Sequence, residues 1–72
     1  MEEIKNKIKK LIDEDRNRFT KNYITYKSEV DELSDYNEII VWIHNNKNFF
    51  NKYYKQDLEL LLQSINDNNL KN

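Results

Sequence analysis

The residues with the clearest chemical potential are one histidine and one run of three carboxylates. His44 is the only histidine, and catalysis by histidine generally needs a nucleophile or an orienting carboxylate close in space. Asp13, Glu14 and Asp15 are consecutive, so on a helix they point about 100° apart and do not converge on one metal ion. We therefore expect no catalytic residue, no metal site and no cofactor, and we predict that the chain is not an enzyme.

The chain also lacks residue types on which other chemistry depends. It has no cysteine, which excludes disulfides and thiolate metal ligands, and no glycine, which excludes the glycine-rich loops that cradle nucleotide phosphates. Its longest apolar run covers five residues, 39–43, whereas a membrane span needs about 20. The first residues carry no signal-peptide pattern. We expect a cytoplasmic protein without a membrane segment.

Aromatic side chains are the most informative feature of the composition. Nine of the 72 residues are aromatic, and a chain this short buries only a small core. Exposed tyrosine and tryptophan often dominate protein–protein interfaces. We predict an aromatic anchor patch for a protein partner, drawn from Trp42, Phe49, Phe50, Tyr53 and Tyr54. On this hypothesis, changing Trp42 and Tyr53 to Ala abolishes partner capture without unfolding the domain. The alternative is that the bundle buries these rings internally.

The net charge of −1 conceals blocks of opposite sign. Residues 29–38 carry five acids and no base, while residues 1–28 and 39–56 each carry a surplus of three positive charges. Such an acidic stretch can steer a basic surface toward it. We predict that it contributes to partner binding through Glu29, Asp31, Glu32, Asp35 and Glu38.

Two other interpretations remain open. Lysines beside aromatic residues are also found in nucleic-acid-binding proteins, so a small nucleic-acid-associated transcriptional regulator is one alternative. Thirteen acids against twelve bases make it the less favoured one. Another alternative is a homo-oligomeric structural component, for example a homodimer. The nucleic-acid hypothesis would use Lys5, Lys9, Arg16, Lys47, Lys52 and Lys55.

The spacing of apolar residues predicts a single all-α domain, a compact bundle of three or four helices with no sheet. The first apolar stripe comprises Ile4, Ile8, Leu11 and Ile12, at helical spacing. Asp15 continues that stripe, so we expect its carboxylate at the edge of the core or opposite a base. A break near residues 18–23 follows from β-branched and aromatic residues there. We expect helices at about 3–17, 23–33, 35–45 and 48–65, and a frayed tail at 66–72.

Helix ends can also be predicted. Ser34 or Asp35 is expected to be the N-cap of the third helix, with Glu38 completing a capping box. That helix should bury Ile39, Ile40 and Ile43, with Trp42 at the border of the core. Since glycine is absent, asparagine in Asn45-Asn46-Lys47-Asn48 is expected to take the left-handed C-cap conformation, and Asn48 to cap the last helix.

Lysine, isoleucine and asparagine make up 30 of the 72 residues, while alanine, glycine and proline are absent. These abundant residues have A/T-rich codons, which favours a gene from a low-GC bacterium, its phages or other mobile elements. The sequence therefore predicts a small non-enzymatic protein-binding module, an inhibitor or adaptor encoded by a phage or mobile element. It would act by steric occlusion of a larger host or defence protein.

Overall fold

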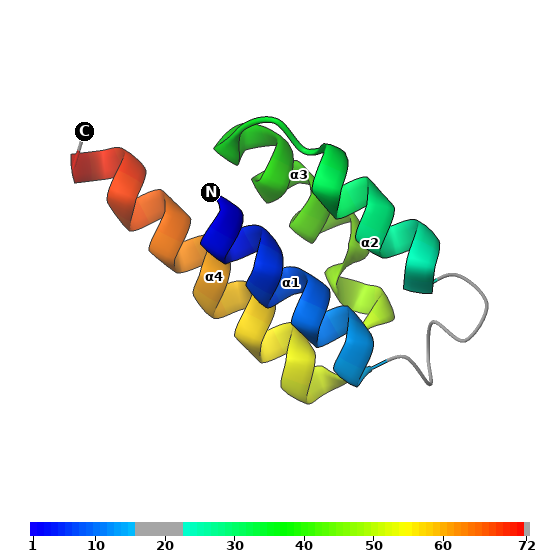
Figure 1. Cartoon of the computed structure of the whole chain (residues 1–72). Helices are drawn as coiled ribbons and strands as arrows, with labels where there is room; N and C mark the ends of the chain where they lie inside the picture. Colours follow the sequence, from blue (N-terminus) through cyan, green and yellow to red (C-terminus); the bar gives the residue numbers. More distant parts are fainter. Residues whose placement is uncertain (16–22, 72) are drawn as a thin grey trace.

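The chain folds into four α-helices and one short 3₁₀ helix, η1, in a computed structural model that describes residues 1–15 and 23–71, with side chains described up to residue 67 (Figure 1). No strand occurs in these ranges. The all-α bundle predicted from the sequence is confirmed. In chain order the elements are α1 (Glu2–Glu14), α2 (Tyr23–Glu32), α3 (Tyr36–Asn46), η1 (Lys47–Phe49) and α4 (Lys52–Lys71).

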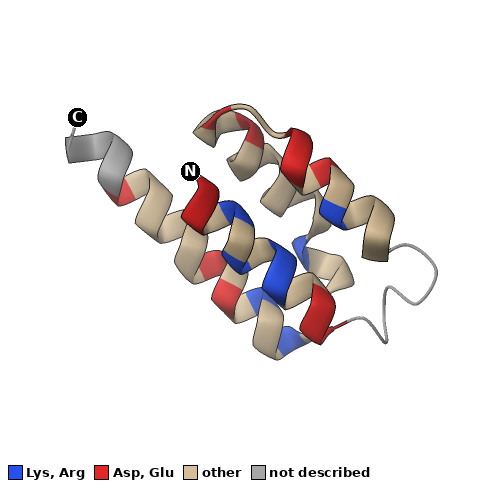
Figure 2. Cartoon of the chain, viewed as in Figure 1, with Lys and Arg blue, Asp and Glu red and all other residues tan. Residues whose placement is uncertain are grey.

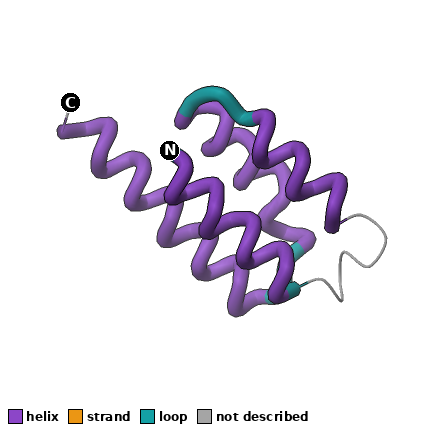
Figure 3. Tube along the Cα trace, in the orientation of Figure 1, coloured by secondary structure: helices purple, strands orange, loops and turns teal. Residues whose placement is uncertain are grey.

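The helices pack so that α1 touches both α2 and α4, and α3 touches α4 (Figures 1 and 3). The chain runs in opposite directions along α1 and α2, because Lys9 near the middle of α1 pairs with Asp31 at the end of α2, whereas Asp13 pairs with Lys27. A break between the first two predicted helices is therefore confirmed. The exact place predicted for it, residues 18–23, lies almost entirely outside the described residues.

The core is formed by one apolar stripe from each helix. Ile8 and Ile12 of α1 are fully buried, as are Val30 of α2, Ile39 and Ile43 of α3, and Leu58 of α4. The buried residues of α1, α3 and α4 recur at three- or four-residue spacing, as helical periodicity requires, whereas α2 buries only Val30. Around them pack partly buried side chains that the same periodicity places at the edge of each stripe, namely Ile4, Tyr23, Tyr26, Leu33, Ile40, Tyr54 and Leu61.

Several predicted helix boundaries were wrong. The first helix ends at Glu14 rather than 17. The last predicted helix divides into η1 and α4, and α4 begins at Lys52 rather than 48. The tail predicted to fray at 66 continues as helix to Lys71. Asn51 caps α4 in place of Asn48: its carbonyl accepts from Lys55 N, and its side-chain Oδ1 accepts from Tyr53 N at 3.3 Å.

The predicted start of α3 is confirmed, but its predicted end is wrong. Asp35 is the N-cap, and its side chain accepts from the Glu38 amide at 2.8 Å. Glu38 in turn accepts from both the backbone and the hydroxyl of Ser34, so all three predicted residues act in one cap. At the other end, no described residue has a positive φ. Asn46 stays right-handed, at φ −117°, because the 3₁₀ turn of η1 ends the helix without a left-handed residue.

The packed chain has the size of an ordinary folded monomer. Its radius of gyration is 11.7 Å and its principal extents are 39 × 24 × 18 Å. It exposes 5048 Å², close to the roughly 4,800 Å² that a folded monomer of this mass exposes. The described fold thus has the compactness typical of a domain of this mass. In the described part of the chain, no helix combines the length and the apolar character needed to cross a bilayer.

Candidate protein-binding site

The structure divides the predicted aromatic patch into a buried half and an exposed half. Trp42 and Phe50 are only 6% and 4% exposed and belong to the core. Tyr54 is half-buried at the edge of the core. Phe49 and Tyr53 remain exposed, at 55% and 68%. The five rings therefore do not form one exposed anchor, and two of them stabilise the fold instead.

Trp42 lies where three segments of the chain meet. Its ring makes edge-on contacts with Tyr26 of α2, at 6.4 Å between centroids, and with Phe50 after η1, at 6.5 Å. Its Nε1 donates a 3.2 Å hydrogen bond to Glu29. Ile40, predicted to be buried, is only partly so, because Trp42 takes the place on the core face of α3. Because Trp42 is buried, we now expect Trp42→Ala to destabilise the domain, in contrast to the prediction from the sequence.

The predicted acidic stretch stays at the surface, but four of its five carboxylates also act within the chain. Asp35 and Glu38 cap α3, and Glu29 accepts from Trp42. Asp31 accepts a 2.6 Å hydrogen bond from Lys9. Glu32 is exposed and has no such contact among the described residues. These internal contacts hold most of the acidic side chains in defined positions.

An open groove lies where α2 passes into α3, and we call it the acidic groove. Its volume is about 480 Å³. Three carboxylates line it and no lysine or arginine does, so its lining is negatively charged; Figure 2 shows Asp and Glu gathered at this junction. Leu33, Val41 and Trp42 supply its apolar lining. The full set is Glu29, Leu33, Asp35, Asn37, Glu38, Val41, Trp42, Asn45 and Asn46.

The side chains around the acidic groove differ in how firmly they are held. Asn46 Nδ2 donates to the carbonyl of Trp42 at 2.8 Å, one turn earlier in α3. Glu29 is held by the indole of the same tryptophan. Val41 and Asn45, in contrast, are exposed, and Val41 is 56% accessible. The groove thus combines fixed carboxylates with an accessible apolar surface.

Most of the lysines named for nucleic-acid binding are buried or already interact with other residues of the chain. Lys5 is 5% exposed, and Lys9 pairs with Asp31. Lys47 lies 3.8 Å from Glu59. Lys52 lies over the ring of Tyr53, at 5.6 Å, and Lys55 is half-buried. Arg16 lies outside the described residues. The structure therefore does not gather these residues into one accessible basic surface.

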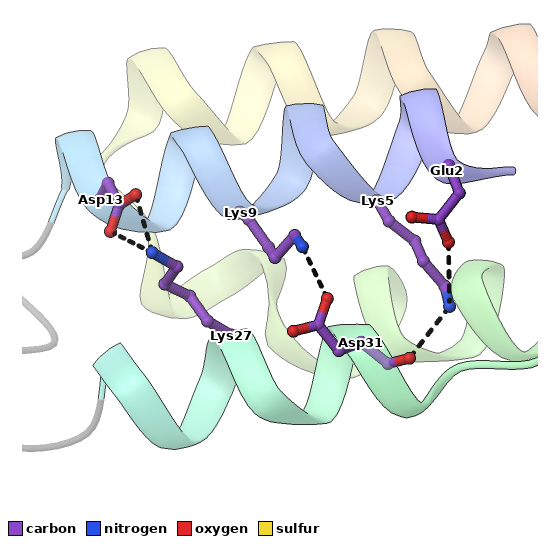
Figure 4. Close-up of polar contacts among 6 residues, drawn as sticks. All are labelled: Glu2, Lys5, Lys9, Asp13, Lys27 and Asp31. Carbon is purple, nitrogen blue, oxygen red and sulfur yellow. Dashed lines mark hydrogen bonds and ion pairs between the residues drawn. The ribbon is translucent and has the colours of Figure 1, made fainter.

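Two ion pairs and a buried lysine join α1 to α2 (Figure 4). Lys27 reaches both oxygens of Asp13, at 2.9 and 3.0 Å. The hydrogen bond between Lys9 and Asp31 lowers the pKa of Asp31 below its usual 3.8 and raises the pKa of Lys9 above 10.5. In both residues desolvation acts in the opposite direction, more weakly than the hydrogen bond. This pair is therefore more firmly charged than either residue alone.

Lys5, named for the nucleic-acid alternative, is buried beside the end of α2. Its Nζ donates to the carbonyl of Asp31 at 3.0 Å and lies 3.9 Å from Glu2. α2 has no basic residue in its own last turn, so Lys5 supplies the positive charge that favours a helix C-terminus. The signal was present in the sequence, because Lys5 precedes Ile8 and Ile12 at the spacing of the buried stripe.

The residues first considered for catalysis do not converge. His44 is exposed on α3. Asp13 pairs with Lys27, and Glu14 is exposed. Asp15 is buried, and its Oδ2 accepts from the Asn51 amide at 2.7 Å, which places it at the edge of the core as expected. Within residues 1–15 and 23–71, no three His, Cys, Asp or Glu residues are grouped so as to hold a metal ion.

Comparison with family models, with curated proteins and with solved structures found no match for this chain.

Proposed function

We propose that this protein is a small non-enzymatic protein-binding module whose acidic groove receives a basic segment of a larger protein. The observation that carries the proposal is the lining of the groove. Its three carboxylates have no lysine or arginine beside them, and they adjoin the exposed Val41 and the apolar edges of Leu33 and Trp42. This pairing of negative charge with apolar surface defines the chemistry of the partner.

Lysine and arginine side chains fit such a surface better than other residues do. Their aliphatic stems cover apolar surface while the charged head reaches polar groups. Arginine can also donate two hydrogen bonds to one carboxylate through its planar fork. Three carboxylates without a neighbouring base attract cations over a distance and so raise the rate of encounter. A basic, partly apolar segment is therefore the expected ligand.

The proposed consequence of binding is steric. A standard interface covers roughly 800 Å² per partner, and this domain exposes 5048 Å² in total. When the groove binds its partner, the rest of the bundle covers the neighbouring surface of that partner and blocks any site that lies there. An inhibitor or adaptor that covers a surface needs no chemistry of its own. Origin from a phage or mobile element of a low-GC bacterium stays a prediction from composition alone.

One substitution tests the groove without disturbing the fold. Asn45 lines the groove, is exposed and forms no contact that the fold uses, so Asn45→Lys places a positive charge among the carboxylates. Asn48→Lys makes the same change of charge at an exposed position outside the groove. In affinity capture with quantitative protein identification, the partner should be lost with Asn45→Lys and kept with Asn48→Lys. Equal capture by the two variants would contradict the proposal.

A further inference from the structure

A second groove, between α1 and α4, has a different character. Its volume is about 310 Å³ and it shares no residue with the acidic groove. We call this surface the α1–α4 face; it is lined by Lys7, Lys10, Leu11, Glu14, Asp57, Leu60 and Leu61. Two bases and two acids are present, so the charges balance. A ligand of uniform charge would meet attraction and repulsion there in equal measure.

The charges of this face are mostly unpaired. Lys10, Glu14 and Asp57 form no hydrogen bond or ion pair with the described residues, and Lys7 makes one exposed contact with Glu3, at 3.8 Å. The α2 side of the same helix differs, since Lys9 and Asp13 are both paired there at 3.0 Å or less (Figure 4). The charged side chains of α1 are therefore paired on the side that α2 covers and mostly unpaired on the α1–α4 face.

Two exposed apolar side chains of α4 lie near these charges: Leu60 lines the face, and Tyr53 stands one helical turn before Asp57. Tyr53 and Leu60 of α4 are 68% and 63% exposed. They are seven residues apart, so they lie on the same side of the helix, separated by about 10 Å along its axis. Leu58, which is fully buried, faces the core from the other side of α4. The helix is thus apolar on two sides, and the fold covers only one of them.

We propose that the α1–α4 face docks a second copy of this chain across a two-fold axis. In a two-fold interface each patch meets its own copy, so lysines of one molecule can face carboxylates of the other, and the converse contact forms by symmetry. A face with equal numbers of positive and negative charges can therefore match the same face of a second copy in charge. The acidic groove cannot serve this purpose, because two copies would oppose carboxylate to carboxylate.

The small size of the face limits the affinity that we expect for the dimer. Two exposed apolar residues and a few charges per copy form a small interface, below the standard class. We expect a reversible dimer with a dissociation constant of about 100 µM, and a weaker one at high salt because the charges are exposed.

Sedimentation equilibrium over a concentration series tests the dimer. The mass of the wild-type chain should rise from 8.9 kDa toward twice that value. Leu60→Lys should raise the dissociation constant by about tenfold or more, whereas Ile24→Lys, at a site 66% exposed on α2, should leave it within about twofold. A chain that stays monomeric at about 500 µM, or equal weakening by both variants, would overturn the proposal.

Reversing one charge in each of two variants tests whether opposite charges pair across the two-fold axis. Lys10→Glu and Asp57→Lys should each dimerise poorly alone, because each leaves the face with three charges of one sign and one of the other. An equimolar mixture should dimerise again, since the excess negative charge of one variant faces the excess positive charge of the other. A mixture no more associated than its components would contradict the two-fold pairing. Glu32→Lys, at an exposed position of α2 outside the face, serves as the control. Circular dichroism verifies that every variant is folded.

Discussion

The side chain of Asp15, at the end of α1, accepts a 2.7 Å hydrogen bond from the backbone amide of Asn51, 36 residues later in the chain. Asn51 is the residue from which α4 starts, so Asp15 satisfies one of the amides left unpaired at that helix terminus. Its negative charge also suits the positive end of the helix dipole. A single carboxylate thereby fixes where α4 begins relative to α1.

Replacing Asp15 by Ala should destabilise the domain. The change leaves a part-buried amide without its charged acceptor, which typically costs about 1–2 kcal/mol. Urea denaturation followed by circular dichroism measures the change in the free energy of unfolding. Asp67→Ala, the same substitution at an exposed position of α4, should change it by less than about 0.5 kcal/mol. Equal stability of the two variants would show that the Asp15 contact contributes nothing.

Trp42 and Tyr53 should behave differently, although both were assigned to one patch from the sequence. Trp42→Ala removes a ring that contacts Tyr26 and Phe50 and should cost about 3–5 kcal/mol, most of the stability of a domain this small. Tyr53→Ala should cost less than about 0.5 kcal/mol, because the ring is exposed. Urea unfolding monitored by circular dichroism compares them. Similar midpoints for the two variants would mean that Trp42 is not a core residue.

The pair formed by Lys9 and Asp31 predicts a dependence of stability on pH. The pKa of Asp31 is lowered in the folded state, so its stabilising contribution is complete above pH 3.8 and is lost as the pH falls through the folded-state pKa. The pKa of Lys9 is raised, so its contribution is complete below pH 10.5 and is lost as the pH rises through its folded-state value. The contribution should be constant between these limits.

Asp31→Asn tests this dependence. Thermal unfolding should show a constant gap between wild type and variant from about pH 5 to 9, and a gap that narrows below pH 3.8. Added salt should also narrow it, since the pair is partly exposed. Glu32→Gln, at the neighbouring exposed residue of α2, controls for loss of charge. An unchanged gap in acid would show that Asp31 does not act through its ionised form.

Local patterns accounted for most of the fold. Three-to-four spacing of isoleucine and leucine placed the buried stripes, and Asp35 with Glu38 marked the start of α3. Both signals depend only on residues within one or two turns of each other. The start of α4 could not be found in this way, because the amide at that helix start is bound by Asp15, which is distant in sequence.

The candidate site was predictable only in part. The acidic stretch was visible as a run of charges, and the structure places three of its carboxylates around one groove. Which aromatic rings are buried could not be predicted from the sequence. Trp42 and Phe50 are buried because α2 and η1 bring other residues against them. The charges and leucines of the α1–α4 face lie on two helices far apart in the chain, so no local pattern indicated them.

Titration with a basic peptide, followed by amide chemical shifts, tests the acidic groove most directly. The probe is a synthetic peptide in which arginine alternates with leucine, and the control peptide has glutamate in place of arginine. We predict shifts centred on Val41 and Asn45, an affinity reduced about fivefold or more by Asn45→Lys and unchanged by Asn48→Lys, and no binding of the control peptide. Shifts centred on another face, or equal weakening by both variants, would contradict the account.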